Sequence, residues 1–205
     1  THRVDVSDAA AVAAAATDVG AAHGACHVVV ANAGVATTGA FADTPLDDLR
    51  WIVDVNLWGV VNVVRSFLPH LRVAGEGHVV TVASMVALVG LPQHAAYSLT
   101  KGAVRSFSEA LRGEVGPEGI GVTCVLPGVV RTNIMGSARG PQAARLAALT
   151  RSRLAAVAML PPEAVGRRIV RAIERDRARA VVGPDARALD VATRILPSRS
   201  SMIGR

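Results

Sequence analysis

The sequence predicts an α/β protein in which a parallel β-sheet is covered by helices on both faces. Two observations support this fold class: short apolar runs recur along the chain, and longer amphipathic segments separate them. Continuous apolar runs are typical of strands buried on both faces, and intervening helices are typical of parallel strands. No Pro/Ser-rich linker or charge block divides the 205 residues, so we expect a single domain over residues 1–205.

Four apolar runs are predicted to be the buried strands: Val28 to Ala31, Val79 to Ala83, Val122 to Leu126 and Ala180 to Gly183. Helices are expected at about residues 9–19, from residue 44 onwards, and at about 93–114, 142–158 and 163–176. Ser7 is the expected N-cap of the first helix. Thr44 is the expected N-cap of the second, with Pro45 and Asp47 in its first turn.

For two of the helices, the sequence also predicts which side chains are buried and which are exposed. The helix at 93–114 is expected to bury an apolar stripe made of Ala96, Leu99, Ala103, Phe107, Ala110 and Leu111. The helix at 163–176 is expected to turn its arginines to solvent, namely Arg167, Arg168, Arg171 and Arg175.

Composition narrows the class of protein. Hydrophobic residues make up 51% of the chain, but charges or glycines interrupt each apolar run before the about 18 residues that a membrane span requires. No signal-peptide pattern is visible. Cys26 and Cys124 lie far apart, beside or within apolar stretches, which favours buried free thiols in a reducing compartment. We therefore expect a cytoplasmic protein without a membrane partner.

The net charge of +6 does not by itself indicate a nucleic-acid partner. Lysine supplies only one of the 22 basic residues, and such an arginine bias is more typical of genome composition than of phosphate binding. Aromatic residues make up 3% of the chain and leave little to stack on bases. The six histidines and two cysteines show no metal-ligand spacing, so no metal site is predicted.

Polar or conformationally special residues follow three successive predicted strands. Asn32-Ala33-Gly34 follows the first, Ser84 the second, and Pro127-Gly128 the third. In open α/β sheets, ligands bind outside the carboxyl ends of the strands. This edge of the sheet is therefore the predicted active site.

Tyr97 and Lys101 are the only tyrosine and the only lysine of the chain, and they stand four positions apart. On a helix, residues i and i+4 share a face. A neighbouring ammonium favours the phenolate and lowers the phenol's pKa from about 10. The phenol could then exchange a proton with a carbonyl or alcohol oxygen, to which Ser84 could also hydrogen-bond. Taken singly, Tyr-x-x-x-Lys is a common helix pattern, and Ser84 could simply end a strand.

Together these residues resemble the short-chain dehydrogenase/reductase family, in its single-domain branch. The family's marks stand in register as Asn32-Ala33-Gly34, Asn56, Ser84 thirteen positions before Tyr97, Tyr97-x-x-x-Lys101, and Pro127-Gly128 followed by Thr132. The resemblance covers essentially the whole chain. It implies a Rossmann-like, doubly wound fold and an NAD(P)-dependent oxidoreductase. In that family Tyr97 would be the general acid/base, Ser84 would orient the substrate oxygen, and Lys101 would tune Tyr97 and hold the nicotinamide ribose.

The same resemblance implies roles for the other site residues. Asn56 would support a water that relays protons to Lys101, although a buried asparagine can also simply cap a local kink. Asp5 with Val6 would touch the adenine, and Asp5 could alternatively be a loop residue before Ser7. The adenosine ribose would lie at Asn32, Ala33 and Gly34. The nicotinamide end would contact the segment from Pro127 to Thr132, with Gly128, Val130 and Thr132 among its residues.

The sequence departs from the family pattern at its start. The family opens with a strand, a Thr-Gly-x-x-x-Gly-x-Gly turn that binds the pyrophosphate, a helix and a second strand, but Thr1 stands where the third strand should end. We therefore expect an N-terminally truncated fragment of a longer protein, in which the strand at 28–31 exposes an apolar edge. The choice between NAD and NADP depends on the missing second strand and stays open.

Residues 85–91 are almost wholly apolar and predict a pocket wall for a hydrophobic ketone or secondary alcohol. The segment from Ile134 and Met135 to Leu160 is expected to form a mobile lid, on which Arg139, Arg145, Arg151 and Arg153 make a solvated face or bind an acidic substrate. A related lyase or epimerase and a catalytically inactive cofactor-sensing or scaffold protein are the alternative functions. The family also implies homo-dimers or homo-tetramers formed through helices at about 45–71 and 93–114.

Overall fold

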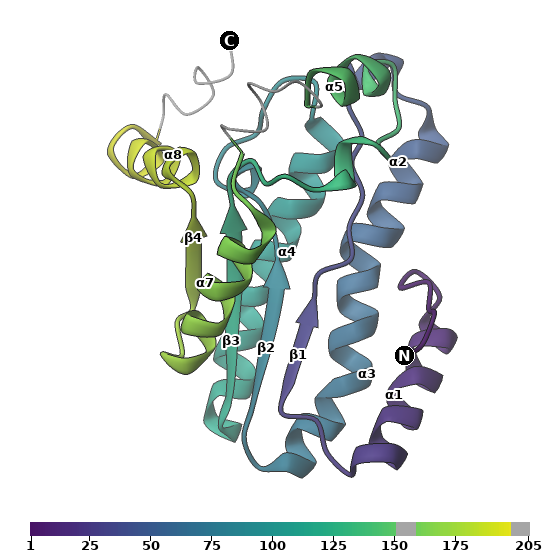
Figure 1. Cartoon of the computed structure of the whole chain (residues 1–205), viewed down its shortest axis with the longest axis vertical. Coiled ribbons are helices and arrows are strands. Elements are labelled where there is room, and N and C mark those ends of the chain that lie inside the picture. The colour runs from purple at the N-terminus through teal and green to yellow at the C-terminus, as the bar shows by residue number, and fades with distance from the viewer. Residues whose placement is uncertain (151–158, 198–205) are drawn as a thin grey trace.

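The computed structural model describes residues 1–150 and 159–197, which form a parallel four-stranded sheet with helices on both faces (Figure 1). The strands are β1 (Val28–Ala31), β2 (Gly77–Val82), β3 (Ile120–Pro127) and β4 (Arg179–Val182), in the order β1-β2-β3-β4. All three neighbouring pairs are parallel. The predicted α/β class and the four strands are confirmed, and each predicted strand end lies within two residues of the observed one.

The longest helices cover one face of the sheet. Helices α3 (Gly59–Ala74) and α4 (Ala95–Val115) pack on β1, β2 and β3, and α1 (Ala9–His23) packs on α3. The central contacts of this face are made by Val79 and Val122 with Val104 of α4, all of them fully buried. Each fully buried Val or Leu contributes about 1.5–3 kcal/mol, so this face stabilises much of the fold.

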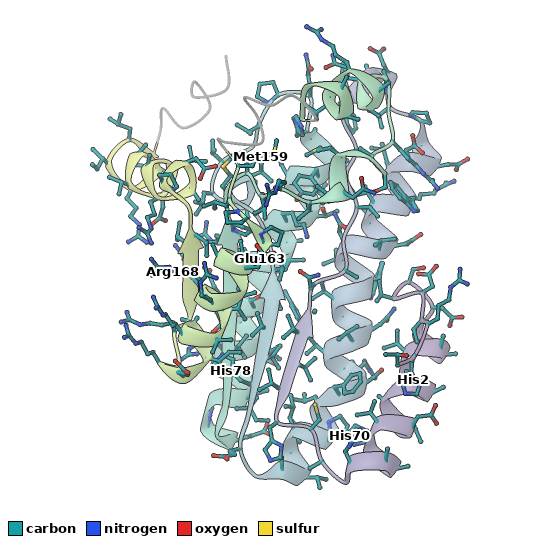
Figure 2. All side chains as sticks on the ribbon, in the orientation of Figure 1. His2, His70, His78, Met159, Glu163 and Arg168 are labelled. Carbon is teal, nitrogen blue, oxygen red and sulfur yellow. The ribbon has the colours of Figure 1, made fainter. Side chains whose placement is uncertain are left out.

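The second face is covered by α7 (Pro162–Glu174), which lies in front of the sheet in Figure 1. Val80, Val125 and Val182 of three strands are buried there against Ile169 and Ile173. The opposite side of α7 is solvated, as predicted, because all four of its predicted surface arginines are exposed; Arg168 is labelled in Figure 2.

The remaining elements surround the carboxyl edge of the sheet or connect its layers. They are α2 (Leu46–Val53), the π-helical turn η2 (Asp54–Trp58), α5 (Ala143–Thr150), α8 (Pro184–Ile195), and the 3-10 turns η1 (Phe41–Asp43), η3 (Met85–Ala87), η4 (Gly116–Glu118) and η5 (Asn133–Met135). Helix α8 is absent from the sequence interpretation above. The predicted helix over 142–158 begins as α5, but residues 151–158, including Arg151 and Arg153, lie outside the described residues.

Two predicted helix caps are wrong. Helix α1 is capped by Asp8, whose carboxylate accepts hydrogen bonds from the backbone N–H groups of Ala10 and Ala11 at 2.9 and 3.0 Å. Ser7 instead donates to Asp5 through both its N–H and its hydroxyl. At α2, Pro45 is the N-cap residue, and the Thr44 hydroxyl donates backwards to the carbonyl of Ala40. Both Ser/Thr candidates are engaged in the preceding turns and are therefore not free to cap.

The predicted buried stripe of α4 is also partly wrong. Leu99 is 60% exposed, whereas the buried side chains of this helix include Tyr97, Thr100, Lys101 and Ser108 beside Val104. Because this helix contains several alanines, its apolar periodicity is ambiguous. The helix places several of its polar side chains on the buried face.

Strand β1 ends the sheet among the described residues. It pairs only with β2, and its side chains alternate: Val28 and Val30 are 45% and 44% exposed, while Val29 and Ala31 are buried. The predicted exposed apolar edge at this strand is confirmed. The truncation that was predicted along with it stays a prediction.

The continuous helical segment made of α2, η2 and α3 (Leu46–Ala74) is, by length and composition alone, apolar enough to cross a membrane. Core helices of water-soluble proteins pass the same test, and this segment packs on the sheet through α3. Only 28% of its most apolar window is buried, so part of its apolar face points outwards.

Candidate active site

The carboxyl ends of the strands meet at one edge, the upper end of the sheet in Figure 1. The Asn32-Ala33-Gly34 loop follows β1 directly, and Ser84 lies two residues beyond β2. Helix α4 begins close to the same edge and brings Tyr97 and Lys101 there in its first two turns. Residues predicted from three separate segments are thus brought to one place.

Lys101 is held tightly at this edge. Its side-chain nitrogen Nζ donates to the carbonyl oxygen of Val82 at 2.9 Å and lies 5.8 Å from the centre of the Tyr97 ring, within the range of a cation–π contact. Only 3% of Lys101 is exposed. Burial disfavours the charged ammonium and lowers the pKa of Lys101 to about 8, while Cys124 acts in the opposite direction.

Tyr97 lies in an apolar cluster with Ala36, Ile52 and Val86 and is 9% exposed. Burial raises the pKa of the Tyr97 phenol above its ordinary value, and hydrogen bonding with the Ser84 hydroxyl lowers it by less. This direction is opposite to the one expected from the sequence. Desolvation of the phenolate outweighs the Ser84 hydrogen bond, and burial disfavours the ammonium form of Lys101 that the sequence argument relied on.

Ser84 stands where β2 passes into η3. Its backbone is extended, and its hydroxyl accepts a long hydrogen bond from the N–H of Val86 at 3.4 Å, which makes it the N-cap of η3. The short turn that follows fixes the position of the hydroxyl next to Tyr97. Ser84 therefore does more than end a strand: it starts a turn and reaches the phenol.

Asn56 is fully buried in the π-helical turn η2. Its Oδ1 accepts from the N–H of Val35 at 2.8 Å, while its Nδ2 donates to the Val35 carbonyl at 2.9 Å and to the Thr100 hydroxyl at 3.2 Å. Both amide hydrogens are used, so the side chain ties the loop after β1 to α4. The predicted water relay would have to use acceptor atoms of Asn56, and this role stays a prediction.

Thr100, which sequence reasoning did not single out, completes this link. Its hydroxyl donates to the carbonyl oxygen of Tyr97 at 2.9 Å and accepts from Asn56. Gly34 closes the site on the other side, because a Cβ atom built there would lie 3.3 Å from both Asn56 Oδ1 and Lys101 Nζ. The preceding residues, Asn32 and Ala33, are exposed at the edge.

The turn after β3 is fixed by the C-terminal part of the chain. The N–H of Gly128 donates to Val182 and that of Val129 to the Asp185 carboxylate, both at 2.8 Å. A side chain at Gly128 would collide with the same carboxylate. Val130 pairs with Leu160 in an isolated bridge. The N–H of Thr132, the last residue predicted here, donates to Val130 at 2.9 Å. Asp185 was missed because α8 itself was missed.

Asp5 and Val6 are anchored elsewhere. Asp5 is exposed and accepts from Ser7, which lowers the pKa of its carboxyl group. The carbonyl of Val6 accepts from Asn62 of α3 at 3.0 Å, and its side chain packs so closely on Gly59 that a Cβ atom there would collide with it. These contacts fit the loop interpretation of Asp5 and leave its contact with adenine as a prediction.

The predicted apolar wall is present around Tyr97. Met85 and Leu91 pack on the Tyr97 cluster, as do Ile134, Met135 and Ala138 of a later segment. Arg139 is exposed, as predicted, and its guanidinium carbon also lies 3.9 Å from the centre of the Trp51 ring. Cys26 is only half-buried, which corrects the prediction that both thiols are buried; Cys124 is buried.

A hollow of about 460 Å³ lies at the opposite, amino end of the strands and is lined by His27, Glu76, His78, Arg112 and Asp176, among others. It contains none of the predicted site residues, and its volume alone does not indicate a ligand or a reaction. In the described ranges 1–150 and 159–197, no group of three or more His, Cys, Asp or Glu side chains is arranged to hold a metal ion.

Known proteins resemble this chain in sequence and in fold. The family model for short chain dehydrogenases matches residues 1–143. The oxidoreductase SadH of Mycobacterium tuberculosis is 39% identical over 203 residues, which cover 97% of this chain and 72% of SadH. The oxidoreductase EphD of Mycobacterium bovis is 38% identical over 201 residues, which cover 95% of this chain and 34% of EphD.

Among solved structures, a short-chain dehydrogenase/reductase from Burkholderia phymatum in complex with NAD superimposes with a TM-score of 0.86. It is 26% identical and covers 96% of this chain, which spans 75% of that protein. The parallel sheet and its likeness to this structure define a Rossmann-like α/β fold, as predicted. The chain belongs to the short-chain dehydrogenase/reductase family of oxidoreductases.

Proposed function

We propose that the protein to which this chain belongs interconverts a ketone or aldehyde and the corresponding alcohol, with NAD or NADP as cofactor. The observation that carries the proposal is the convergence of the only tyrosine and the only lysine: Lys101 Nζ lies 5.8 Å from the Tyr97 ring, beside Ser84. A phenol, an amine and a hydroxyl at the carboxyl edge of a parallel sheet suit proton transfer to an oxygen atom.

In the reductive direction, Tyr97 donates its proton to the substrate oxygen while Ser84 holds that oxygen by a hydrogen bond. The nicotinamide cofactor supplies the hydride when bound. Lys101, with a pKa of about 8, keeps enough positive charge near neutral pH to stabilise the phenolate that Tyr97 becomes. Asn56 keeps the loop after β1 in place and would support the water that returns a proton to Lys101.

Several residues fit a nicotinamide cofactor. Asn32 and Ala33 are exposed beside Gly34, where the missing side chain leaves room near Lys101, and they would hold the adenosine ribose. Pro127, Gly128, Val130 and Thr132 would hold the nicotinamide end. Binding of NAD by the Burkholderia phymatum relative supports a nicotinamide cofactor, but not a choice between NAD and NADP.

The apolar cluster around Tyr97 supports a hydrophobic substrate, since Met85, Val86, Leu91 and Ile134 offer it no charged group. The exposed apolar side chains of the predicted interface helices support a homo-dimer or homo-tetramer. Trp58 is 54% exposed and Leu99 60% exposed. A cytoplasmic location is supported only by the two free cysteines.

A catalytically inactive cofactor-sensing or scaffold protein that keeps only the fold is the second candidate. A lyase or epimerase using the same tyrosine would also fit the site. These alternatives differ from the proposal in turnover: only the oxidoreductase consumes NADH or NADPH stoichiometrically with a ketone.

The test is a titration of NADH and of NADPH into the chain, followed by nicotinamide fluorescence, and then turnover of a panel of apolar ketones by the full-length parent protein. Saturable binding and NAD(P)H consumption are expected. Tyr97→Phe is expected to lower turnover at least about a hundredfold while binding is kept, because general acid catalysis contributes about 10²–10⁴. Full turnover by Tyr97→Phe would refute the proposed role.

A further inference from the structure

The segment that follows η5 is joined to the loop after β1 by backbone hydrogen bonds. The N–H of Arg139 donates to the carbonyl of Ala36, and the N–H of Thr38 donates to the carbonyl of Arg139, both at 3.0 Å. The N–H of Gln142 donates to Thr38 at 3.3 Å. Two segments that lie about 100 residues apart in the sequence thus form a short parallel ladder.

Glycine makes this close approach possible. Gly140 has a φ of +104°, and a Cβ atom there would collide with the backbone carbonyl of Thr38. Gly39, on the facing segment, has a φ of +138°, and a Cβ atom there would lie 2.7 Å from Pro141. A side chain at either position would therefore separate the two segments, since both the backbone angle and the available space require glycine.

The side chain of Arg139 continues the junction to α2. Its guanidinium carbon lies 3.9 Å from the centre of the Trp51 ring, and its Nη1 lies 3.6 Å from Oδ1 of Asp48. The Asp48 side chain is 18% exposed and the Arg139 side chain 50% exposed, so the carboxylate is shielded while the guanidinium stays in contact with solvent. A planar guanidinium stacks on an indole face better than any other cationic side chain.

The residues next to Arg139 cover the catalytic tyrosine. Ile134, Met135 and Ala138 pack on the buried cluster that contains Tyr97, and Trp51 packs on the same cluster from α2. Arg139 therefore joins two walls of one apolar enclosure: the segment 134–142 and the helix α2. Without this contact, the segment 134–142 would be held to α2 by apolar packing alone.

We propose that Arg139 is a positioning residue that holds segment 134–142 against Trp51, so that the substrate side of Tyr97 is dry and admits only apolar substrate groups. The mobile lid expected over residues 134–160 stays a prediction, and the proposal concerns only how its first part, up to Gln142, is held. The proposal rests on the proposed function in one respect, namely that Tyr97 is the acid/base group. Its structural part is independent of activity and is tested without cofactor or substrate.

The test uses the fact that the chain has one tyrosine. Absorbance at 295 nm against pH reports the ionisation of Tyr97 alone, and circular dichroism at the same pH values reports whether the chain is folded. Arg139→Gln is expected to lower the Tyr97 titration midpoint by about 0.5–1 pH unit, because water then reaches the phenolate. Loss of a positive charge by itself would act in the opposite direction and raise the midpoint.

Arg145→Gln is the matched control, since it removes the same charge from an exposed position of neighbouring α5. It is expected to leave the midpoint unchanged or slightly raised. Arg139→Lys is expected to behave like Arg139→Gln at high pH, because an exposed lysine loses its charge near pH 10.4 while arginine keeps it.

An unchanged or raised midpoint in folded Arg139→Gln would overturn the proposal. If that variant does not fold, Asp48→Asn serves instead: it preserves the shape of the side chain and weakens the junction from α2. Loss of a negative charge lowers the midpoint by itself, so Asp48→Asn is compared with Asp47→Asn, which removes the same charge from an exposed position of α2. A larger fall is expected for Asp48→Asn, and a fall no larger than that of Asp47→Asn overturns the proposal. If Arg139→Gln lowers the Tyr97 midpoint but the protein never turns over a ketone, the positioning role of Arg139 stands and only the proposed function is refuted.

Discussion

The side-chain nitrogen of Lys101 is bound to the carbonyl oxygen of Val82, the last residue of β2, at 2.9 Å. The only lysine of the chain is therefore fixed to the strand that leads into Ser84, two residues further on. A single strand end thus sets the positions of both the amine and the hydroxyl relative to Tyr97. This contact also explains why Lys101 is so buried, and it underlies the first prediction.

We predict that Lys101 titrates near pH 8 in the folded chain. The unfolded lysine titrates near 10.4, so between these values the unfolded state binds more protons, and stability must rise with pH across that window. The buried ammonium is destabilising below pH 8, by up to about 3 kcal/mol for a shift of this size. Carbon-13 NMR of labelled lysine reports the midpoint without ambiguity, because there is only one lysine.

Lys101→Met provides the control for this interpretation. It is expected to raise the melting temperature at pH 7 and to abolish the rise in stability between about pH 8 and 10.4. A lysine that titrates at its ordinary value would show that water reaches Nζ and would contradict the buried geometry.

The Thr100 hydroxyl is predicted to stabilise the fold beyond what the volume of its side chain contributes. Thr100→Val keeps the shape but leaves a buried Asn56 N–H without an acceptor and the Tyr97 carbonyl without this donor, which costs about 1–3 kcal/mol. Thr100→Ser retains the hydroxyl and should restore most of the loss. Urea unfolding of the wild type and the two variants measures the difference in the free energy of unfolding. Equal stability of the Val and Ser variants would show that the Thr100 hydroxyl does not stabilise the connection between Asn56 and Tyr97.

His78 is predicted to make the fold acid-sensitive. Its Nε2 lies 2.8 Å from the Thr123 hydroxyl, whose own hydrogen is donated to Arg177 at 2.6 Å, so Nε2 must carry a hydrogen. Burial lowers the pKa of His78, Asp176 raises it by less, and Arg112 lowers it further. The ring lies at the amino end of the sheet, where it is labelled in Figure 2.

The sign of this effect follows from the lowered pKa. The unfolded histidine binds a proton more readily than the folded one, so stability is highest above about pH 6.5 and falls as the pH drops below that value. His78→Gln is expected to flatten the dependence of melting temperature on pH below about pH 6.5. The His2→Gln control, at an exposed residue that is also labelled in Figure 2, should leave the curve unchanged. Parallel curves for wild type and His78→Gln would contradict the prediction.

The open edge of β1 is predicted to drive self-association. Val30→Lys places a charge on the exposed side of this strand and should reduce light scattering with little change in melting temperature. Val29→Lys is the matched variant on the buried side of the same strand and should unfold the chain. In a longer parent protein that supplies neighbouring strands, Val30→Lys should instead be destabilising. Identical scattering by wild type and Val30→Lys would show that this edge is not the associating surface.

Local patterns predicted the strands and the central pair well. Buried parallel strands are short and almost wholly apolar, so Val28–Ala31 could be located without knowledge of its partners. The four-residue spacing of Tyr97 and Lys101 places both on one helix face in any context. Such features depend on covalent spacing and local periodicity, which the sequence states directly.

The errors concern properties that depend on distant contacts. The direction of the Tyr97 pKa shift is decided by burial among Ala36, Ile52 and Val86, which come from three other segments. The contact of Arg139 with Trp51 joins residues far apart in the sequence, and an arginine in a polar segment shows no local sign of it. Helix α8 begins at Pro184, directly after Gly183, so the Gly-Pro pair at its start resembled a turn.

The bond between Val129 and Asp185 spans 56 residues and has a consequence for the order in which the protein forms. During synthesis the turn after β3 leaves the ribosome well before α8 does, and it can adopt its final shape only when that helix arrives. Contacts between distant parts of a chain form late, because a long loop must close first. The turn after β3 is therefore expected to be among the last parts of the molecule to mature, and a nascent chain that stops short of Asp185 would carry Tyr97 and Lys101 without this turn in its final shape.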